Sequence, residues 1–363
     1  QTASLLVFQL LPFLVATHGH AFRVVCLVVG MSNVLTLHAF HVSHINEQNE
    51  MDDDAAKNGM DWGEWQCRTS SNWDSSWELT GMLDVYRQRG PKLSTTTKAI
   101  SFGMPFDGRS RTAPIYPLTA LLLAAAGLPV VLQGAGRMPV KYGVSSAELF
   151  SSLGVNWTGR NLETLQQCLD ATNLALVHQP DHFPAAESLI PYREDLGKRP
   201  PVASLELLWT AHQGEHLLVS GFVHPPTEAR AWEALKLADE PDVMTVKGLE
   251  GSTDLPISRA CVTARCSNNQ QERQILHPRD HGCHDADVEW ADDNTWAEQA
   301  RNALQNKGPL CDALRWNAGA YLWFSGCSDS LEQGIQRAAS VLQTGQAQAM
   351  LDQLCAWRSS LTI

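Results

Sequence analysis

Two glycine-containing loops on either side of a long apolar segment constrain the fold of this chain more than any other feature. The first loop spans 103–108 and carries Asp107, and the second spans 134–136. The residues between them predict an alanine- and leucine-rich helix over 118–126, followed by a short buried strand over 129–132. Loops of this kind at the ends of buried elements are typical of an α/β domain built on a parallel sheet.

The same alternation of strands and helices continues downstream. Apolar, β-branched runs over 217–224 and 243–247 predict two strands, and 227–238 between them predicts a helix. This βαβ unit implies that its strands pair in parallel. Residues 257–268 begin a further strand pair, and other helices are predicted at 145–153, 296–305, 311–324 and 331–344. We therefore predict an α/β fold, in which helices flank a large, mostly parallel sheet and a smaller all-helical domain accompanies it.

The predicted elements divide the chain into three parts. Residues 1–76 form an N-terminal extension, which we expect to be partly helical. Residues 77–96 belong to the small helical domain, to which helices near 145–195 also contribute. Residues 97–358 form the α/β domain, which is long enough to bury a large core.

The N-terminal extension begins with two apolar runs, 4–16 and 24–37, which polar residues separate. Neither run reaches the roughly 18–20 residues that a helix needs to cross a membrane. No basic segment precedes the first run, as a signal peptide would require. We interpret the two runs as helices that are buried or packed against a partner, with a membrane anchor as the alternative.

The overall charge and the cysteines limit the classes of function. The 363 residues carry a formal net charge of −12, which argues against broad, non-specific attraction to nucleic acid. Nine cysteines are scattered along the chain without a compact framework. In a chain of this size, such usage is typical of reduced thiols in the cytoplasm and not of a disulfide scaffold.

Basic residues follow each glycine loop closely. Arg109 and Arg111 come directly after the first loop, and Arg137 and Lys141 come after the second. Backbone N–H groups of glycine loops and guanidinium groups both favour phosphate. The two loops together therefore predict an anion site, although a single glycine loop more often serves only to turn the chain.

The glycine loops and several downstream segments resemble the anthranilate phosphoribosyltransferase family. The first loop stands where that family has G-T-G-G-D, and the second stands where it has H-G-N-R. Residues 192–199 resemble its R-x-x-L-G-x-R segment, and 246–255 resemble the strand and acidic loop that bind magnesium in the family. The resemblance extends from about Trp77 to Trp357 and includes segments similar to the family's C-terminal helices, at 307–312, 317–320 and 329–332.

This resemblance implies a magnesium-dependent pentosyltransferase that transfers phosphoribose from phosphoribosyl diphosphate to an aromatic amine, as in tryptophan biosynthesis. It also implies a cytoplasmic homodimer. Such chemistry relies on amides and cations that hold the diphosphate and on carboxylates that hold the metal. By resemblance, the catalytic candidates are Asp107, Lys141 and Arg193, and the magnesium candidates are Glu250 and Asp254. The phosphate-binding candidates are Gly103, Gly108, Arg109, Arg111, Thr112, Thr119, Gly134 and Arg137.

Several positions depart from the family pattern. Pro105 replaces a loop glycine, and proline removes an amide donor. The adjacent Asp-Glu metal pair of the family aligns with Thr253 and Asp254, and its acceptor-side histidine aligns with Phe183. Arg193 is retained, and it aligns with an arginine that contacts anthranilate in the family. These departures leave the identity of the amine acceptor open.

A second hypothesis is a catalytically inactive homologue that binds nucleic acid or another phosphorylated ligand in the same cleft. The pattern G-x-P-F-D-G-x-x-R-T, followed by M-P-x-K-Y-G, resembles a divergent branch of the family, some of whose members bind nucleic acid. Basic side chains in the cleft would then contact the phosphate backbone. The candidates are Arg109, Arg111, Arg137, Lys141, Arg193, Lys198 and Arg199.

A third hypothesis is a zinc site in the segment 261–284, which is rich in cysteine and histidine. Thiolate and imidazole groups are the usual zinc ligands in proteins. The spacing matches no standard zinc motif, so cysteines without a metal are the competing interpretation. The candidate ligands are Cys261, Cys266, His277, His281, Cys283 and His284.

Overall fold

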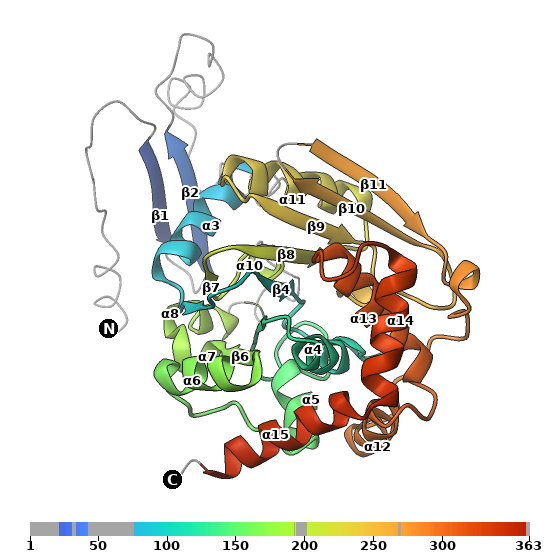
Figure 1. Ribbon diagram of the computed structural model, residues 1–363. Coiled ribbons are helices and arrows are strands. Elements are labelled where there is room, and N and C mark those ends of the chain that lie inside the picture. Colours follow the sequence, from blue (N-terminus) through green and yellow to red (C-terminus); the bar gives the residue numbers. More distant parts are fainter. Residues whose placement is uncertain are drawn as a thin grey trace.

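The computed structural model describes residues 22–30, 34–42, 76–191, 193, 202–267 and 270–360. Its centre is a seven-stranded sheet with the strand order β11-β10-β9-β8-β4-β5-β6 (Figure 1). The five strands from β9 to β6 are parallel, and β10 and β11 continue the sheet antiparallel. The strands are β4 (Ala99–Gly103), β5 (Val130–Gly134), β6 (Leu174–His178), β8 (His216–Gly221), β9 (Asp242–Val246), β10 (Cys261–Ser267) and β11 (Gln270–Leu276).

Helices connect the strands, and further helices follow β11 toward the C-terminus. The longer ones are α3 (Ser76–Arg89), α4 (Tyr116–Ala125), α5 (Ser146–Ser152), α6 (Leu162–Thr172), α11 (Pro225–Leu237), α12 (Asp293–Leu304), α13 (Cys311–Phe324), α14 (Leu331–Gln343) and α15 (Gln346–Ser360). The short ones are α7 (Gln179–His182), α8 (Pro184–Glu187), α10 (Val202–Leu205), η2 (Leu249–Gly251) and η3 (Pro278–His281). Two short parallel strands, β3 (Leu93–Ser94) and β7 (His212–Gln213), pair outside the main sheet.

The chain leaves the neighbouring strands β4 and β8 in opposite directions. β4 leads through α4 to β5 on one side of the sheet order, and β8 leads through α11 to β9 on the other. In open α/β sheets, ligands bind at such a switch point, beyond the carboxyl ends of the strands. The fold therefore points to the loops that follow β4 and β8 as the place for a site.

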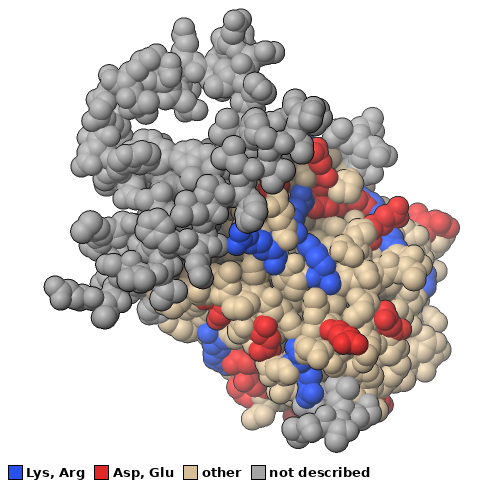
Figure 2. Space-filling model, turned by 90° about the vertical axis from the view of Figure 1, so that its left-hand side faces the viewer, with Lys and Arg blue, Asp and Glu red and all other residues tan. Residues whose placement is uncertain are grey.

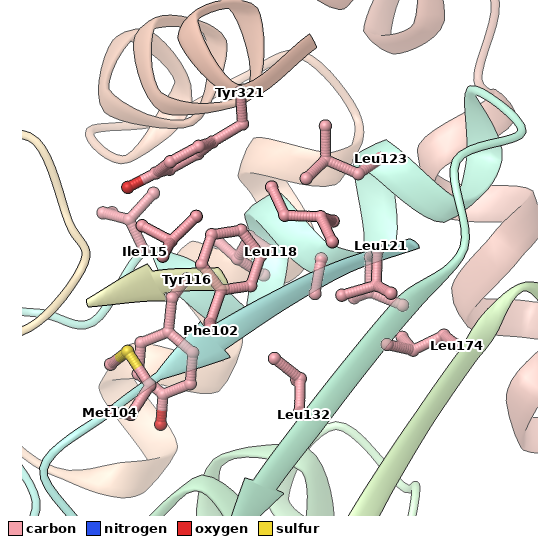
Figure 3. Close-up of a cluster of buried hydrophobic side chains, with 14 of the residues drawn as sticks. Phe102, Met104, Ile115, Tyr116, Leu118, Leu121, Leu123, Leu132, Leu174 and Tyr321 are labelled. Atoms are coloured by element: carbon pink, nitrogen blue, oxygen red, sulfur yellow. The ribbon is translucent and has the colours of Figure 1, made fainter. Parts of the chain in front are cut away.

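Helix α4 lies at the centre of the hydrophobic core (Figure 3). Its Leu118 and Leu121 are fully buried, as is Leu132 of β5. The ring of Tyr321, on α13, meets the ring of Phe102, on β4, edge to face with centroids 4.9 Å apart. α13, α14 and α15 all pack against α4. Because α4 is covered on nearly every side, it is apolar all round.

The predicted α/β fold is confirmed. The helix predicted over 118–126 corresponds to α4, and the strand predicted over 129–132 corresponds to β5. The predicted βαβ unit is β8, α11 and β9, and β8 and β9 are parallel. The strand pair that the sequence places from 257–268 onward is the antiparallel hairpin of β10 and β11.

The helix predicted over 24–37 is wrong. This segment contains most of β1 (Phe22–Gly30) and the start of β2 (Val34–Val42), which form an antiparallel hairpin. Two pairs of valines in β1 explain the difference, because branching at Cβ favours an extended backbone over a helix. The apolar run over 4–16 lies outside the described residues.

Helix α3 packs against α11 of the α/β layer. The hydroxyl of Thr80 donates to the carbonyl of Ala234 at 3.2 Å, and both groups are buried. The division of the chain into a small helical domain and an α/β domain stays a prediction. Within the described ranges, no helix combines the length and the apolar character that crossing a membrane requires.

Candidate active site

Three loops lie beyond the carboxyl ends of the parallel strands. We now extend the first glycine loop to residues 103–112, at the end of β4, and the second glycine loop to residues 134–145, at the end of β5, so that each includes the basic residues that follow it. Residues 248–254, after β9, form the acidic loop. Because the parallel strands end at one edge of the sheet, these loops meet there although they are far apart in the sequence.

The two glycine loops are joined by backbone hydrogen bonds. The amide of Gly143 donates to the carbonyl of Asp107 at 2.9 Å, and the amide of Val144 donates to the carbonyl of Arg109 at 2.8 Å. Gly108, with φ at +74°, lies so close to the backbone of Val144 that no side chain would fit. The two extended glycine loops are therefore one structural unit.

Glu250 of the acidic loop binds the backbone of the first glycine loop. Its carboxylate accepts the amides of Ser110 at 3.2 Å, Arg111 at 3.1 Å and Thr112 at 2.9 Å, and the hydroxyl of Thr112 at 3.0 Å. Burial opposes its charge, but these hydrogen bonds and the guanidinium of Arg109 outweigh burial and lower the pKa of Glu250 to about 2. An internal carboxylate thus holds the amides that were expected to bind phosphate.

Asp254 occupies the N-terminus of α4 in a similar way. Its Oδ2 atom accepts the guanidinium of Arg109 and the amide of Ile115, the latter at 2.8 Å. The side chain of the N-cap residue Ile115 forms no hydrogen bond that would cap this end of the helix. Burial raises the pKa of Asp254, although Arg109 and the helix amides act against it. A carboxylate at a helix N-terminus is stabilised by the helix dipole, so Asp254 serves as a distant cap of α4.

The two carboxylates that were predicted to hold magnesium lie together, but both contact Arg109. The Nε atom of Arg109 is 3.6 Å from Glu250, its Nη1 atom binds Asp254, and its side chain is 2% exposed. Magnesium prefers near-octahedral oxygen ligands and keeps several waters. A magnesium ion placed here would be repelled by the positively charged guanidinium of Arg109. In addition, the side chain of Asp254 is almost completely buried. As arranged, the pair does not fit a resident magnesium ion.

The remaining phosphate-binding candidates are placed differently. Gly103 lies against the backbone of Leu207, which leaves no room for a side chain, and Thr119 is fully buried within α4. Gly134 ends β5 in the interior, with the side chain of Ser146 close by. Of these three residues, none offers an open surface to a phosphate group.

Three of the predicted cations lie at the rim of the loops. The side chain of Arg111 is 77% exposed, and its Nε is 3.6 Å from Glu250. Lys141 donates to the carbonyl of Gly108 at 3.3 Å, and its side chain is partly exposed. Arg137 forms an ion pair with Glu148, with its Nε atom 2.6 Å from the Oε1 atom of the carboxylate. Arg111 and Lys141 are thus close to both the first glycine loop and the acidic loop.

The structure adds Glu206, which the sequence interpretation missed. Its carboxylate forms an ion pair with Arg193 and accepts the amide of Phe106 at 3.0 Å. Both side chains of the ion pair are nearly completely buried. Burial raises the pKa of Glu206 to about 7, against the lowering effect of Arg193. The sequence did contain a signal for this residue. Glu206 stands within the mostly apolar run 203–209, and an acid that is buried there needs a partner.

A cavity of about 160 Å³ opens between the loops that follow β4 and β8. Three acidic residues are among those that line it, Asp107, Glu206 and Glu250. Phe222 and Leu207 contribute apolar wall. The cavity lies at the switch point of the sheet, where the fold predicts a ligand.

The cations proposed to bind nucleic acid do not share one surface. Arg109 and Arg193 are each 1% exposed, whereas Arg111 is at the rim. Lys198 and Arg199 lie outside the described residues. On the face that Figure 2 shows, basic and acidic side chains are scattered among uncharged ones. Arg109 and Arg193, being buried, therefore do not offer their charges to a phosphate backbone.

The zinc hypothesis is not supported. The thiol of Cys261 points to the carbonyl of Lys247, and the ring of His284 contacts the carbonyl of Ile257 at 2.9 Å. All six candidate ligands belong to the described part of the chain, and in that part no three His, Cys, Asp or Glu side chains gather as a metal ion would require.

The fold and the loop cluster together define a glycosyltransferase α/β domain. Residues 109–348 match the family described as "Glycosyl transferase family, a/b domain". The chain is 30% identical to the anthranilate phosphoribosyltransferase of Chromobacterium violaceum, over 68% of this chain and 72% of that protein. It is 28% identical to that of an Acidovorax species, over 78% and 83%. The chain therefore belongs to the glycosyl transferase family and, within it, to the anthranilate phosphoribosyltransferase family.

Solved structures agree with this fold. The anthranilate phosphoribosyltransferase of Thermus thermophilus superposes with a TM-score of 0.65 at 23% identity, covering 79% of this chain and 86% of that one. The Saccharomyces cerevisiae enzyme, in complex with PRPP and Mg, gives a TM-score of 0.68 at 13% identity, covering 81% and 83%. Magnesium is thus bound by a protein that shares this fold.

Proposed function

We propose that this protein transfers phosphoribose from phosphoribosyl diphosphate to an aromatic amine, as its relatives' names indicate for anthranilate. One observation carries the proposal: the cavity of about 160 Å³ at the switch point between β4 and β8. In this arrangement the cavity takes the acceptor ring, and the loops at its rim take phosphoribosyl diphosphate. Ligands of open α/β sheets bind at this position.

The transfer requires few changes of bonding. The bond between C1 of the ribose and the diphosphate oxygen breaks, a bond between C1 and the acceptor nitrogen forms, and the nitrogen loses one proton. The protein contributes by holding the two substrates in line and by stabilising the charge of the leaving diphosphate. We assign the charge to Arg111 and Lys141 at the rim, and we assign Asp107, at the cavity wall, to the positioning of the sugar.

Magnesium belongs to this proposal as the counter-ion that reaches the site with phosphoribosyl diphosphate. Its binding by Glu250 and Asp254, as the resemblance implies, would require both carboxylates to leave Arg109. We therefore derive no step through a metal ion held by these two residues. We include the homodimer and the cytoplasmic location in the proposal as well. Free thiols at Cys168, Cys261 and Cys283 support a reducing compartment.

Calorimetric titration tests the proposal directly. Phosphoribosyl diphosphate is titrated into the protein with and without magnesium, and diphosphate release is then followed with aromatic amines present. We expect saturable binding that magnesium strengthens, followed by release of diphosphate that depends on the amine. A charge-reversed Lys141→Glu variant should bind much more weakly, because the leaving group then faces a carboxylate. Absence of binding by the wild-type protein would refute the proposal.

A further inference from the structure

The guanidinium of Arg109 lies among oxygen atoms of the first glycine loop and the acidic loop. Its Nη1 atom donates to Oδ2 of Asp254 and, at 3.4 Å, to the hydroxyl of Ser252. Its Nη2 atom donates to the hydroxyl of Thr112, and its Nε atom is 3.6 Å from Oε1 of Glu250. Carboxylate and hydroxyl oxygens are also the ligands that proteins offer to magnesium. The oxygen atoms that a metal site would need are therefore present, but all four groups already contact a guanidinium.

The charges around Glu250 are also balanced without a metal ion. Its Oε2 atom is 3.6 Å from Nε of Arg111 and 3.9 Å from Nζ of Lys141. Within the described structure, these two cations and Arg109 thus face the two carboxylates of Glu250 and Asp254. A divalent ion would add two positive charges to a place that is already neutralised, and like charges in a buried site repel strongly. Arg109 cannot make room by losing its proton, because arginine stays protonated in proteins.

The backbone holds Arg109 in this position. Its amide donates to the carbonyl of Val144 at 3.4 Å, and its carbonyl accepts the amide of Val144 at 2.8 Å, so both glycine loops fix the point from which the side chain starts. The side chain is 2% exposed. Moving the guanidinium out would leave two buried carboxylates without their shared counter-charge, which is strongly unfavourable.

From these contacts we propose that Arg109 occupies the place that the resemblance assigns to magnesium, and that the protein binds no divalent cation between Glu250 and Asp254. The guanidinium then does what a metal ion would do there, because it holds the acidic loop against the first glycine loop. Magnesium takes part only as the counter-ion of phosphoribosyl diphosphate. The inference concerns the protein without its substrates, so it does not depend on phosphoribosyl transfer.

Manganese alone, without any substrate, tests the inference on the wild-type protein. Mn²⁺ prefers the same oxygen ligands as Mg²⁺, and electron paramagnetic resonance measures how much of it stays free in solution. We expect the wild type and Glu250→Gln to bind Mn²⁺ equally weakly, because the carboxylate of Glu250 is engaged by Arg109 and by backbone amides. One Mn²⁺ per chain, bound by the wild type and lost in Glu250→Gln, would overturn the inference.

Removal of the guanidinium should create the metal site. In Arg109→Ala, two carboxylates and two hydroxyls are left around the vacated space without a counter-charge. This variant should bind one Mn²⁺ per chain about tenfold or more tightly than the wild type, since a new counter-charge stabilises buried carboxylates. Magnesium should also raise its Tm and leave that of the wild type unchanged. The double variant Arg109→Ala/Glu250→Gln should lose the gained site, and Arg109→Ala without any gain would overturn the inference.

Arg111→Ala is the matched control. It removes the same charge beside the same glutamate, but from a side chain that is 77% exposed. We expect it to bind Mn²⁺ as weakly as the wild type. A gain as large as that of Arg109→Ala would show that net charge, and not the occupied place, excludes the metal, and the inference would fall. If Arg109→Ala does not fold, as circular dichroism would show, the comparison of wild type with Glu250→Gln still decides.

These results are independent of the proposed function. Binding of phosphoribosyl diphosphate is measured separately, in the calorimetric titration. If it binds with magnesium and the wild type also holds Mn²⁺ through Glu250, the transferase proposal stands and the inference on Arg109 falls. If it does not bind and only Arg109→Ala gains a metal, the inference stands and the transferase proposal falls.

Discussion

Two buried arginine–carboxylate clusters lie beyond the ends of the strands, and their glutamates have opposite properties. Beside Arg109, Glu250 accepts three backbone amides and a hydroxyl, and its pKa falls to about 2. Beside Arg193, Glu206 accepts one backbone amide within the described structure, and burial raises its pKa to about 7. An arginine alone does not keep a buried acid ionised; the extent of burial and the number of hydrogen-bond donors act together.

The two glutamates also differ in their surroundings. Glu250 is held by the first glycine loop, and Asp254 beside it caps α4, so the Arg109 cluster joins three segments of the fold. Glu206 lines the cavity and has fewer hydrogen-bond partners of its own. A group of this kind gains most from a ligand that donates a hydrogen bond to it.

Replacing Arg109 should have the largest effect. Arg109→Met removes the shared counter-charge of two buried carboxylates, and loss of one partner from a buried ion pair costs about 3–5 kcal/mol of folding free energy. Urea denaturation at neutral pH measures the loss. Arg111→Ala is the control, because its side chain is 77% exposed and an exposed pair contributes at most about 1 kcal/mol. Similar losses in the two variants would mean that Arg109 is not central to the cluster.

The Glu206 cluster should be recognisable by how stability changes with pH. The pKa of Glu206 is about 7 in the folded protein and 4.5 by ordinary reference, so the folded state holds this proton more tightly. Stability from this group is present below pH 4.5 and falls as pH rises to 7, by an amount on the order of 3 kcal/mol. Denaturation of wild type and Glu206→Gln at several pH values tests this. The same slope in both proteins would refute the assignment.

Glu250 should show the opposite dependence of stability on pH. Its pKa is lowered from 4.5 to about 2, so its contribution to stability is present above pH 4.5 and is lost as pH falls toward 2. In Glu250→Gln, the free energy of unfolding should fall less steeply as pH is lowered below 4.5. Its dependence on pH between pH 5 and 7 should be the same as in the wild type. Thermal unfolding between pH 2.5 and 5 measures the difference. If the variant and the wild type lose stability in parallel there, the contrast between the two glutamates does not hold.

The sequence predicts local features well and long-range partners poorly. The loops around α4 and the βαβ unit of β8, α11 and β9 follow from hydrophobic pattern and glycine positions, which are local signals. The ion pair of Glu206 with Arg193 joins residues only 13 apart, but it depends on the burial of both side chains by the rest of the fold, which no spacing reveals. The same holds for Arg109, which we predicted to bind phosphate from its place after a loop and which instead binds Asp254, 145 residues away.

The N-terminal hairpin shows the limit of periodicity. A continuous apolar run is compatible with a helix or a strand, and the pairs of valines in β1 were the signal that decides between them. The partner of Arg193 could not be predicted either, because the family resemblance assigns this residue to the acceptor and does not show its ion pair with Glu206.

The capping of α4 by Asp254 has a consequence for the order in which the protein acquires its structure during translation. The amide of Ile115 waits for an acceptor 139 residues later, and the carbonyl of Pro114 waits for the indole of Trp296, 182 residues later. When α4 emerges from the ribosome, neither Asp254 nor Trp296 has been synthesised. The central helix of the core therefore emerges with an open N-terminus and an apolar surface on all sides, which is the situation in which nascent chains recruit chaperones. Slowing elongation between residues 125 and 254 would prolong that exposure.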